Sequence, residues 1–294
     1  MYAIKKSDQT LFTPKAKDVC RIEEGSTNTY LNSEREIEIF LRQIEPNYNS
    51  SVKKALNCQF DLESIHTIAG FISYIITCSP AAMRIHSEFF RATVEQTARI
   101  LDKSGKIPPP PEQLREENLT TLIENGTVNI NIDEKYPQAH GISSVLSNTA
   151  IFGNSDWEVL INHFQDSPFF SSDYPVAIEP SDNPNVLNRV IPLTPFLAIR
   201  IKPNIHATRN NPNLDFSNFS YQQKQLSRAE VRRLNQLFVQ CAETIVFFSS
   251  KESWVVRFVE KNSQYRIKSK TNKMPHVGNA ILQFSQEISN YQYT

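Results

Sequence analysis

The chain has 294 residues, of which 39% are hydrophobic and 21% are charged. Such a composition can bury a sizeable core and excludes a chain that is disordered throughout. Lys plus Arg equals Asp plus Glu, 31 against 31, so no overall charge attracts nucleic acid or acidic lipid. Only 7 residues are glycine, which argues against the Gly-rich loops that cradle phosphates.

The sequence carries no pattern typical of export or membrane insertion. No segment approaches the ~18 consecutive apolar residues of a membrane-spanning helix, and the first residues lack the basic-then-apolar layout of a signal peptide. The cysteines are scattered without a CxxC pair, at Cys20, Cys58, Cys78 and Cys241. These patterns predict a cytoplasmic protein without a membrane segment, whose thiols are free and mostly buried.

The first thirty residues show the alternation of β-strands. Tyr2–Ile4 and Leu11–Thr13 flank a polar turn and predict a hairpin, and Val19–Ile22 predicts a further short extended piece. The first strand leaves an unpaired edge, so we expect either a preceding segment or a later strand to cover it.

From Ser33 the hydrophobic period changes to that of a helix. One apolar stripe is formed by Ile37, Phe40, Leu41 and Ile44. Ser33 as N-cap, with Glu36 three residues later, predicts a capping box, and Pro46 ends the run. A second helix is expected over Tyr48–Leu56.

Longer helices follow, with a proline-rich linker among them. Asp61 is the expected N-cap of one helix, and Ser79-Pro80 opens the next. The predicted helices cover about 62–76, 80–101 and 134–150. Four consecutive prolines within 106–112 predict a stiff polyproline II linker, and 112–134 is interpreted as a surface excursion of short helices.

The second half of the chain has mostly β patterns. Short strands separated by Pro, Asn and Ser are predicted at Trp157–Phe164, Phe169–Phe170, Tyr174–Ile178, Arg189–Ile191, Phe196–Ile201, Thr244–Phe248 and Trp254–Val259. One helix, Ser227–Ala242, interrupts them. Helices that precede strands, without βαβ alternation, favour an α+β fold.

The predicted architecture is therefore α+β, with an N-terminal β-hairpin, a central helical bundle, and a mostly antiparallel sheet with one long helix packed on it. We predict a single domain over 1–260, in which the helical part covers about 33–150 and the β-rich part about 151–260. Residues 261–294 are predicted to form a polar C-terminal tail, partly irregular.

The sequence motifs of well-known enzyme and cofactor sites are missing. No GxGxxG, GxxxxGK[ST], HExxH or GxSxG occurs, so the sequence has no small-molecule cofactor motif. The six histidines share no ligand-like spacing with another His or Cys, which argues against a zinc site. The cofactor is thus unknown, and a divalent metal held by carboxylates stays open.

The strongest local candidate is Asp173, which follows Ser172 between two hydrophobic runs. In one interpretation the pair forms a turn, in which both side chains bond local backbone N–H groups and Pro175 stiffens the exit. In the other, Asp173 is held rigidly at a sheet end, where a carboxylate binds a metal or activates water. Glu179 is a supporting candidate nearby.

Further candidates lie on the helices and in the first strand after them. Glu38 and Glu45 are spaced i, i+7 and either line a cleft between helices and sheet or belong to a solvated face. Arg84 is a candidate phosphate ligand, although its spacing to Glu88 predicts an exposed i, i+4 ion pair. Trp157 is a candidate binding residue, with a core position as the alternative.

Several short motifs stand along the chain in a fixed order. They are Lys17-Asp18-Val19-Cys20 with Tyr30, the Glu36–Glu45 run, Ser79-Pro80 with Arg84, Asp156-Trp157, Ser172-Asp173-Tyr174-Pro175-Val176, Pro192-Leu193-Thr194-Pro195, Leu234-Asn235 and Ala242-Glu243. In this order they resemble the bacterial family catalogued as domain of unknown function 4238, over roughly residues 2–260. Two departures stand out: no H-x-x-P-Q-F-Y-L segment precedes Met1, and Ser79-Pro80 replaces a Thr-Pro that usually follows Arg. The family name implies a shared fold and no mechanism.

Two functions fit these patterns. The first is an intracellular hydrolase of nucleic-acid or nucleotide phosphodiesters, in which Asp173 and Glu45 position metal or water. Glu38 and Glu179 would support them and Arg84 would contact phosphate. The second is a non-catalytic binding or regulatory module of a two-protein bacterial system, whose polyproline segment and tail contact a protein partner. A small-ligand site built on aromatic side chains is a third alternative.

Overall fold

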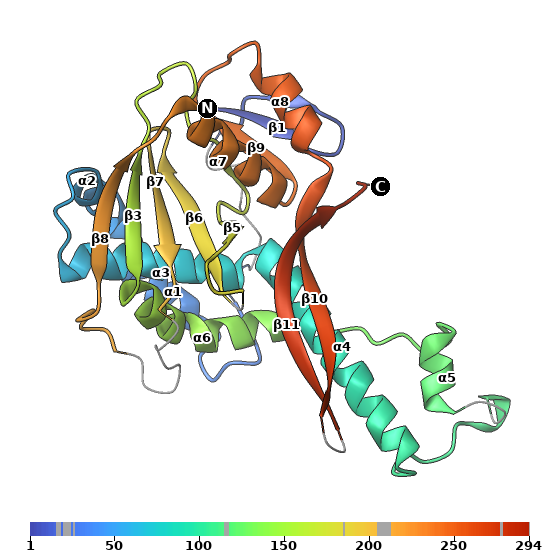
Figure 1. The fold of residues 1–294 in the computed structure, drawn as a ribbon. Coiled ribbons are helices and arrows are strands. Elements are labelled where there is room, and N and C mark those ends of the chain that lie inside the picture. Colours follow the sequence, from blue (N-terminus) through green and yellow to red (C-terminus); the bar gives the residue numbers. More distant parts are fainter. Residues whose placement is uncertain are drawn as a thin grey trace.

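The centre of the molecule is a mixed sheet whose strands follow the order β5-β6-β7-β3-β8 in this computed structural model (Figure 1). The strands are β3 (Asp156–Ile161), β5 (Ala177–Pro180), β6 (Leu187–Thr194), β7 (Leu197–Lys202) and β8 (Ser220–Gln225). Their pairs are antiparallel except β3 with β8, which is parallel. The structure describes residues 1–15, 19, 25, 27–114, 118–184, 186–204, 213–276 and 279–293.

A second sheet confirms the N-terminal hairpin and covers its first strand. Its order is β2-β1-β9-β4, with β1 (Tyr2–Lys5), β2 (Leu11–Phe12), β4 (Ser171–Ser172) and β9 (Ile245–Phe248). All three pairs are antiparallel, and Ala3 lies between Phe12 on one side and Phe247 on the other. The expected later strand is therefore β9. Of the extended piece predicted over Val19–Ile22, residues 20–22 lie outside the described residues.

The helical part consists of α1 (Glu36–Ile44), α2 (Tyr48–Leu56), α3 (Leu62–Cys78), α4 (Pro80–Lys103), α5 (Leu119–Glu124) and α6 (Lys135–Gly153), with 3-10 turns η2 (Glu45–Asn47) and η3 (Glu112–Leu114). Asp61 and Ser64 form the capping box of α3, and the Ser79 side chain caps α4. The capping box predicted at Ser33 is wrong. The α1 helix begins at Glu36 after Arg35, without a side-chain cap.

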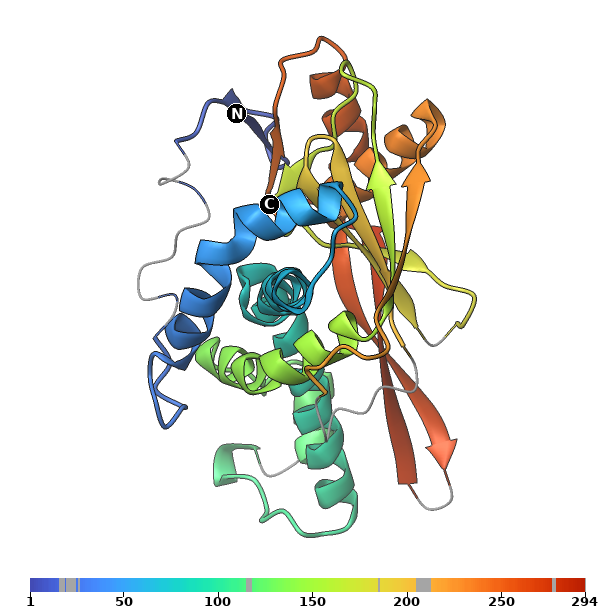
Figure 2. The ribbon, with the colours of Figure 1, turned by 90° about the vertical axis from the view of Figure 1, so that its left-hand side faces the viewer.

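The helices α3 and α6 pack together and cover one face of the central sheet, whereas α7 (Arg228–Cys241) lies on the other (Figure 2). A Cβ on Gly141 of α6 would stand 2.3 Å from the Thr77 carbonyl oxygen of α3. Glycine is therefore required for this close approach. The predicted long helix is confirmed as α7, with a capping box between Ser227 and Glu230.

The strand predicted at Trp254–Val259 is wrong, because Val255–Asn262 forms helix α8. Its buried residues Val255 and Val259 are spaced i, i+4, so packing of a helical stripe overrides the strand preference of valine. In the opposite sense, the polar run Ser220–Gln225, in which every residue is exposed, forms β8 without any hydrophobic alternation that would predict it.

The C-terminal tail is also corrected, because most of it forms a long antiparallel hairpin. The strands are β10 (Tyr265–His276) and β11 (Asn279–Asn290), with Tyr265 opposite Asn290. The hairpin lies along α4 and continues with it below the body of the molecule (Figure 1). Ile267 at its base is buried, while most other side chains in this hairpin are polar. A domain boundary at residue 260 stays a prediction.

The cysteines and the apolar helices can also be compared with the expectations from the sequence, within the described part of the chain. Cys78 and Cys241 are free and buried, and Cys58 is free and half-buried. No single described helix is long and apolar enough to cross a membrane; α3 and α4 pass that test only as a joined pair, bent by 54°.

Candidate functional site

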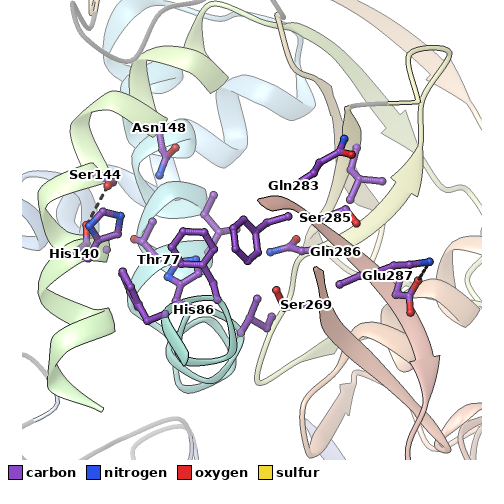
Figure 3. A pocket seen from close by; sticks show the side chains of 18 of the residues that line it. Thr77, His86, His140, Ser144, Asn148, Ser269, Gln283, Ser285, Gln286 and Glu287 are labelled. Carbon is purple, nitrogen blue, oxygen red and sulfur yellow. Dashed lines mark hydrogen bonds and ion pairs between the residues drawn. The ribbon is translucent and has the colours of Figure 1, made fainter. Parts of the chain in front are cut away.

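A cavity of about 650 Å³ lies between the helices and the C-terminal hairpin, and we call it the hairpin cavity (Figure 3). Its walls come from the end of α3, from α4 and α6, from the segment around β6, and from β10 and β11. Figure 3 shows His140, Ser144 and Asn148 on one side, with Ser285 and Gln286 on the other. The sequence does not predict this cavity, because its patterns assign the wall formed by β10 and β11 to an irregular tail.

The polar lining of the hairpin cavity consists mostly of amide, hydroxyl and imidazole side chains. It includes Thr77, His86, His140, Ser144, Asn148, Ser269, Asn272, Gln283, Ser285 and Gln286. The apolar part contains both aliphatic and aromatic side chains, and Phe89 of α4 meets Phe284 of β11 edge to face with ring centroids 4.1 Å apart. The cavity thus combines aromatic rings with many hydrogen-bonding groups.

The charged groups of the hairpin cavity are balanced or bonded within the protein. Lys270 lies 3.3 Å from the Glu287 carboxylate. Arg189 donates a hydrogen bond of 2.8 Å to Oε1 of Gln286, and burial lowers the pKa of its guanidinium. Arginine is not deprotonated in proteins, so the side chain stays cationic. Among the described residues no group of three His, Cys, Asp or Glu side chains could hold a metal.

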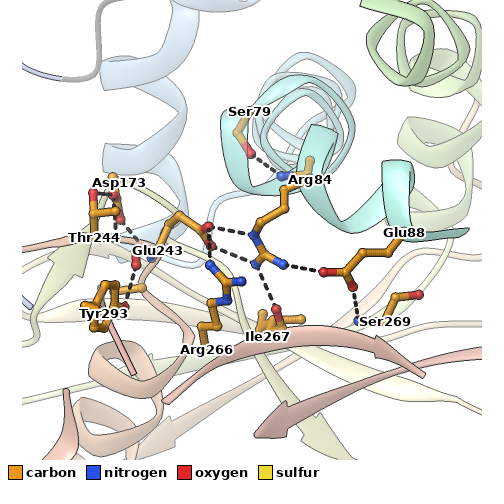
Figure 4. A network of polar contacts seen from close by, with 12 residues as sticks. Ser79, Arg84, Glu88, Asp173, Glu243, Thr244, Arg266, Ile267, Ser269 and Tyr293 are labelled. Carbon is orange, nitrogen blue, oxygen red and sulfur yellow. Dashed lines mark hydrogen bonds and ion pairs between the residues drawn. The ribbon is translucent and has the colours of Figure 1, made fainter. Parts of the chain in front are cut away.

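Asp173, the leading sequence candidate, lies outside this cavity and is half-buried beside the turn that joins α7 to β9 (Figure 4). Its Oδ1 accepts a hydrogen bond from Glu243 N at 3.0 Å. Its Oδ2 accepts from Thr244 N at 2.8 Å, Thr244 Oγ1 at 2.5 Å and Ile245 N at 3.1 Å. Burial raises the pKa of Asp173, and these hydrogen bonds act in the opposite direction. Both oxygens are therefore engaged in holding a turn.

The remaining carboxylates predicted to act with Asp173 are not brought to it. Glu45 is exposed in η2 at the end of α1, and Glu38 is half-buried on α1, 3.8 Å from Arg35. Ser172 does remain beside Asp173, as a buried residue of β4 whose Oγ accepts a hydrogen bond from Tyr174 N at 3.2 Å. Ser172 makes the local contact that the turn interpretation predicts, whereas Asp173 bonds backbone groups 70 to 72 residues further along the chain. A catalytic role for Asp173 and Glu45 stays a prediction.

Arg84 belongs to the same region as Asp173, and its assignment to an exposed face is wrong. Its Nε and Nη2 atoms donate to the two carboxylate oxygens of Glu243 at 2.6 and 2.8 Å (Figure 4). The predicted pair with Glu88 also forms, at 3.2 Å, and Nη2 donates to Ile267 O at 2.8 Å. Arg266 approaches Glu243 to 3.6 Å. We call Lys6, Arg84, Asp173, Glu243 and Arg266 the α7 junction.

Lys6 is the member of the α7 junction that sequence reasoning misses most completely. Its Nζ is buried and donates to the carbonyl oxygens of Val239, Ala242 and Tyr265 at 2.8, 2.7 and 2.6 Å. Burial lowers the pKa of Lys6 to about 8. A cation at this end of α7 is favoured by the helix dipole. The signal in the sequence is a lysine directly after a short apolar strand, which is not specific.

Glu179 of β5 joins a different charged group, which includes Arg233 of α7. Arg200 Nε and Arg233 Nη1 donate to its two carboxylate oxygens, both at 2.6 Å. Arg200 also pairs with Glu158, whose partner Lys202 lies at 2.6 Å. Burial acts to raise the pKa of Glu158, but Lys202 and Arg200 outweigh it and lower that pKa. Around this group lies a cleft of about 530 Å³.

Trp157 is a core residue, in agreement with the alternative stated above. It is fully buried, and its Nε1 donates a hydrogen bond of 2.8 Å to Phe152 O. Its indole meets the rings of Phe60 and Phe219 edge to face. It is therefore closed to any ligand in this structure.

The fold and cavity define an α+β protein in which a helical layer, a mixed sheet and a long C-terminal hairpin surround a polar site. A family model described as "Protein of unknown function (DUF4238)" matches residues 1–252. The chain belongs to this family, and the match ends before β10 and β11. No curated protein and no solved structure matches the chain.

Proposed function

We propose that this protein binds a small, uncharged, polar molecule in the hairpin cavity. The observation that carries the proposal is the composition of the lining, which combines amides, hydroxyls and imidazoles with aromatic rings. Amide and hydroxyl side chains each donate and accept hydrogen bonds, so they match a ligand rich in both kinds of group. A saccharide or a nucleoside has this chemistry.

The charges of the lining support an uncharged ligand. Lys270 is paired with Glu287, and Arg189 donates a hydrogen bond to Gln286, so each of these charged side chains already has a partner within the protein. A charged ligand would compete with the ion pair between Lys270 and Glu287. A neutral ligand meets the side chains as they stand.

The dimensions of the hairpin cavity fit a ligand of this size. Small-molecule sites typically enclose about 300–1,000 Å³, and the value here is about 650 Å³. Phe89 and Phe284 supply aromatic rings against which a sugar ring or a base can pack. Asn148 and Ser285 lie on opposite walls and supply polar contacts from α6 and β11.

Binding accounts for the geometry better than hydrolysis by Asp173 and Glu45. Asp173 already accepts four hydrogen bonds from residues 243–245, and Glu45 is exposed on a separate helical turn. The hydrolase hypothesis and its phosphodiester substrates thus have no additional support from these contacts. A partner protein, the other part of the binding-module hypothesis, also stays a prediction.

The proposal is tested by a thermal-shift screen with neutral mono- and disaccharides and nucleosides, followed by calorimetric titration of each hit. At a ligand concentration of 100 Kd, binding stabilises the fold by about 2.7 kcal/mol, which raises Tm by roughly 5 °C. Asn148→Leu puts an apolar group into the lining and should abolish the shift. Asn49→Leu, the same change at an exposed position of α2, is the matched control and should preserve it.

Two results would count against this function. One is a screen in which none of these neutral compounds raises Tm. The other is a hit whose affinity is the same in Asn148→Leu as in the unchanged protein, because that compound binds elsewhere. Mass spectrometry of each incubated hit would detect turnover, so binding and hydrolysis are separated in the same experiment.

A further inference from the structure

A second cleft, of about 450 Å³, lies between α7 and α8 and is separate from the hairpin cavity. Figure 1 shows these two helices near one another at the top of the molecule. We call it the basic cleft because its lining includes Arg228 and Arg232 of α7 and Arg257 and Lys261 of α8. Each helix contributes its two cations at i, i+4 spacing, which places them on one face.

The positive charge of the basic cleft is largely uncompensated. Arg228 pairs with Asp166 at 2.9 Å, and Asp166 is the one carboxylate among the described residues of the lining. Arg232, Arg257 and Lys261 are exposed and make no ion pair with any described residue. The cleft therefore carries an excess of three positive charges in a chain whose formal net charge is zero. Such a local excess attracts an anion.

The floor of the basic cleft is aromatic and held in place by its own contacts. Trp254 stacks on the buried Phe170, with centroids 5.6 Å apart and ring planes 23° apart, and meets Phe258 edge to face at 5.5 Å. Its Nε1 donates a hydrogen bond of 3.2 Å to Asp166 O. The indole is half-buried and lines the cleft, so part of it faces the space beneath the cations.

These two observations together select the ligand chemistry. Guanidinium groups bind phosphate through paired, charge-assisted hydrogen bonds, and a fixed indole is a surface on which a base stacks. An acidic peptide would satisfy the charges without using the indole as a stacking surface. We propose that the basic cleft binds a nucleoside phosphate, with the phosphate between Arg232 and Arg257 and the base against Trp254. The source is either a free nucleotide or a unit of single-stranded nucleic acid.

The test follows tryptophan fluorescence during titration with AMP. Trp157 is fully buried, so quenching by AMP reports on Trp254. Removing one guanidinium that binds the phosphate should weaken binding about tenfold. The double variant Arg232→Gln/Arg257→Gln should therefore raise the Kd of AMP about a hundredfold. The matched control Arg91→Gln/Lys103→Gln removes the same charge from exposed positions of α4 and should leave the Kd unchanged.

Adenosine, inorganic phosphate, hexaglutamate and a 12-residue oligothymidylate complete the set of probes. Adenosine and phosphate should each bind at least tenfold more weakly than AMP, because each supplies half of the contacts. Tighter binding of the oligothymidylate than of AMP identifies a strand as the source, and the reverse order identifies a free nucleotide. The proposal is overturned if neither nucleotide probe quenches the fluorescence, if both double variants bind equally weakly, or if hexaglutamate binds as tightly as the nucleotides. Circular dichroism confirms that each variant is folded.

Discussion

The ion pair between Arg84 and Glu243 should be one of the contacts that hold the C-terminal hairpin to the body. Arg84 belongs to α4, Glu243 follows α7, and the same guanidinium donates to Ile267 O at the base of β10. Arg84→Met keeps much of the apolar stem and removes all of these hydrogen bonds. The variant therefore leaves the Glu243 carboxylate with Arg266, at 3.6 Å, as its remaining cation.

The expected decrease in stability follows from the burial of the pair. Removing one partner of a buried ion pair costs about 3–5 kcal/mol. The Arg84 and Glu243 side chains are 22% and 16% exposed, and Arg266 retains part of the attraction. We therefore expect Arg84→Met to lower the free energy of unfolding by about 2–3 kcal/mol. A double-mutant cycle with Glu243→Gln should give a coupling energy of about 2 kcal/mol.

The same helix offers a matched control. Arg91 and Glu95 form another i, i+4 pair on α4, at 3.7 Å, with side chains 57% and 34% exposed. An exposed pair of this kind contributes less than about 0.5 kcal/mol. Urea denaturation followed by circular dichroism should therefore separate Arg84→Met clearly from Arg91→Met. Hydrogen exchange should also become faster in β10 and β11 of the Arg84 variant alone.

Two results would refute this reasoning. If Arg84→Met and Arg91→Met lower the free energy of unfolding equally, the bidentate contact with Glu243 contributes no more than a surface pair. The other result is that Arg84→Met destabilises the whole chain, but amide hydrogen exchange in β10 and β11 is accelerated no more than in the other strands. The contact then supports the body and does not anchor the hairpin.

Two further substitutions test the α7 junction. Asp173→Asn removes one of the two oxygens that accept hydrogen bonds from 243–245, so we expect the free energy of unfolding to fall by about 1–3 kcal/mol; an unchanged thermal midpoint would contradict this. For Lys6, the folded pKa of about 8 lies below the ordinary lysine value of 10.5, so between these values the unfolded state binds more protons and stability rises with pH. The free energy of unfolding, relative to that of Lys6→Met, should increase by about 2 kcal/mol from about pH 7.5 to about pH 9.5 in urea titrations, and a constant difference would exclude a depressed pKa.

The elements that could be predicted are those whose signals are local in sequence. Asp61 with Ser64, and Ser227 with Glu230, lie within one helical turn of each other, so the start of α3 and that of α7 are readable from a few residues. Ser33 with Glu36 offers the same pattern before α1, but no side chain caps that helix. A capping pattern permits a helix start at a given residue, and the packing of the following stripe decides where the helix begins.

The C-terminal hairpin escapes prediction because strand prediction depends on hydrophobic alternation. Ile267 is buried at the base of β10, while much of β10 and β11 extends beside α4 with polar residues. Backbone pairing between two strands of 12 residues specifies the structure there. The hairpin cavity depends on this pairing, so the patterns of the individual segments do not reveal it.

Asp173 is correctly singled out by the sequence as a constrained carboxylate, yet the sequence does not indicate what constrains it. Its partners at 243–245 lie 70 to 72 residues further along the chain. Lys6 and Arg84 reach the same turn from still farther, and each of the three side chains satisfies a different backbone or side-chain group at the end of α7. Charged side chains that are bonded in this way fix the course of the chain at the end of α7. Their structural role explains their position, and no catalytic role is needed to account for it.

The α7 junction also has a mechanical link to the proposed binding site. Lys6 and Arg84 bond to the carbonyl oxygens of Tyr265 and Ile267 in β10, the strand that continues into the wall of the hairpin cavity. The opposite wall includes α4, which carries Arg84 itself. The junction thus fixes the separation of these two walls at one end, and a ligand bound between them would act on the same strand. The charged residues of the α7 junction therefore help to hold the walls of the proposed site in place, although none of them lines the cavity.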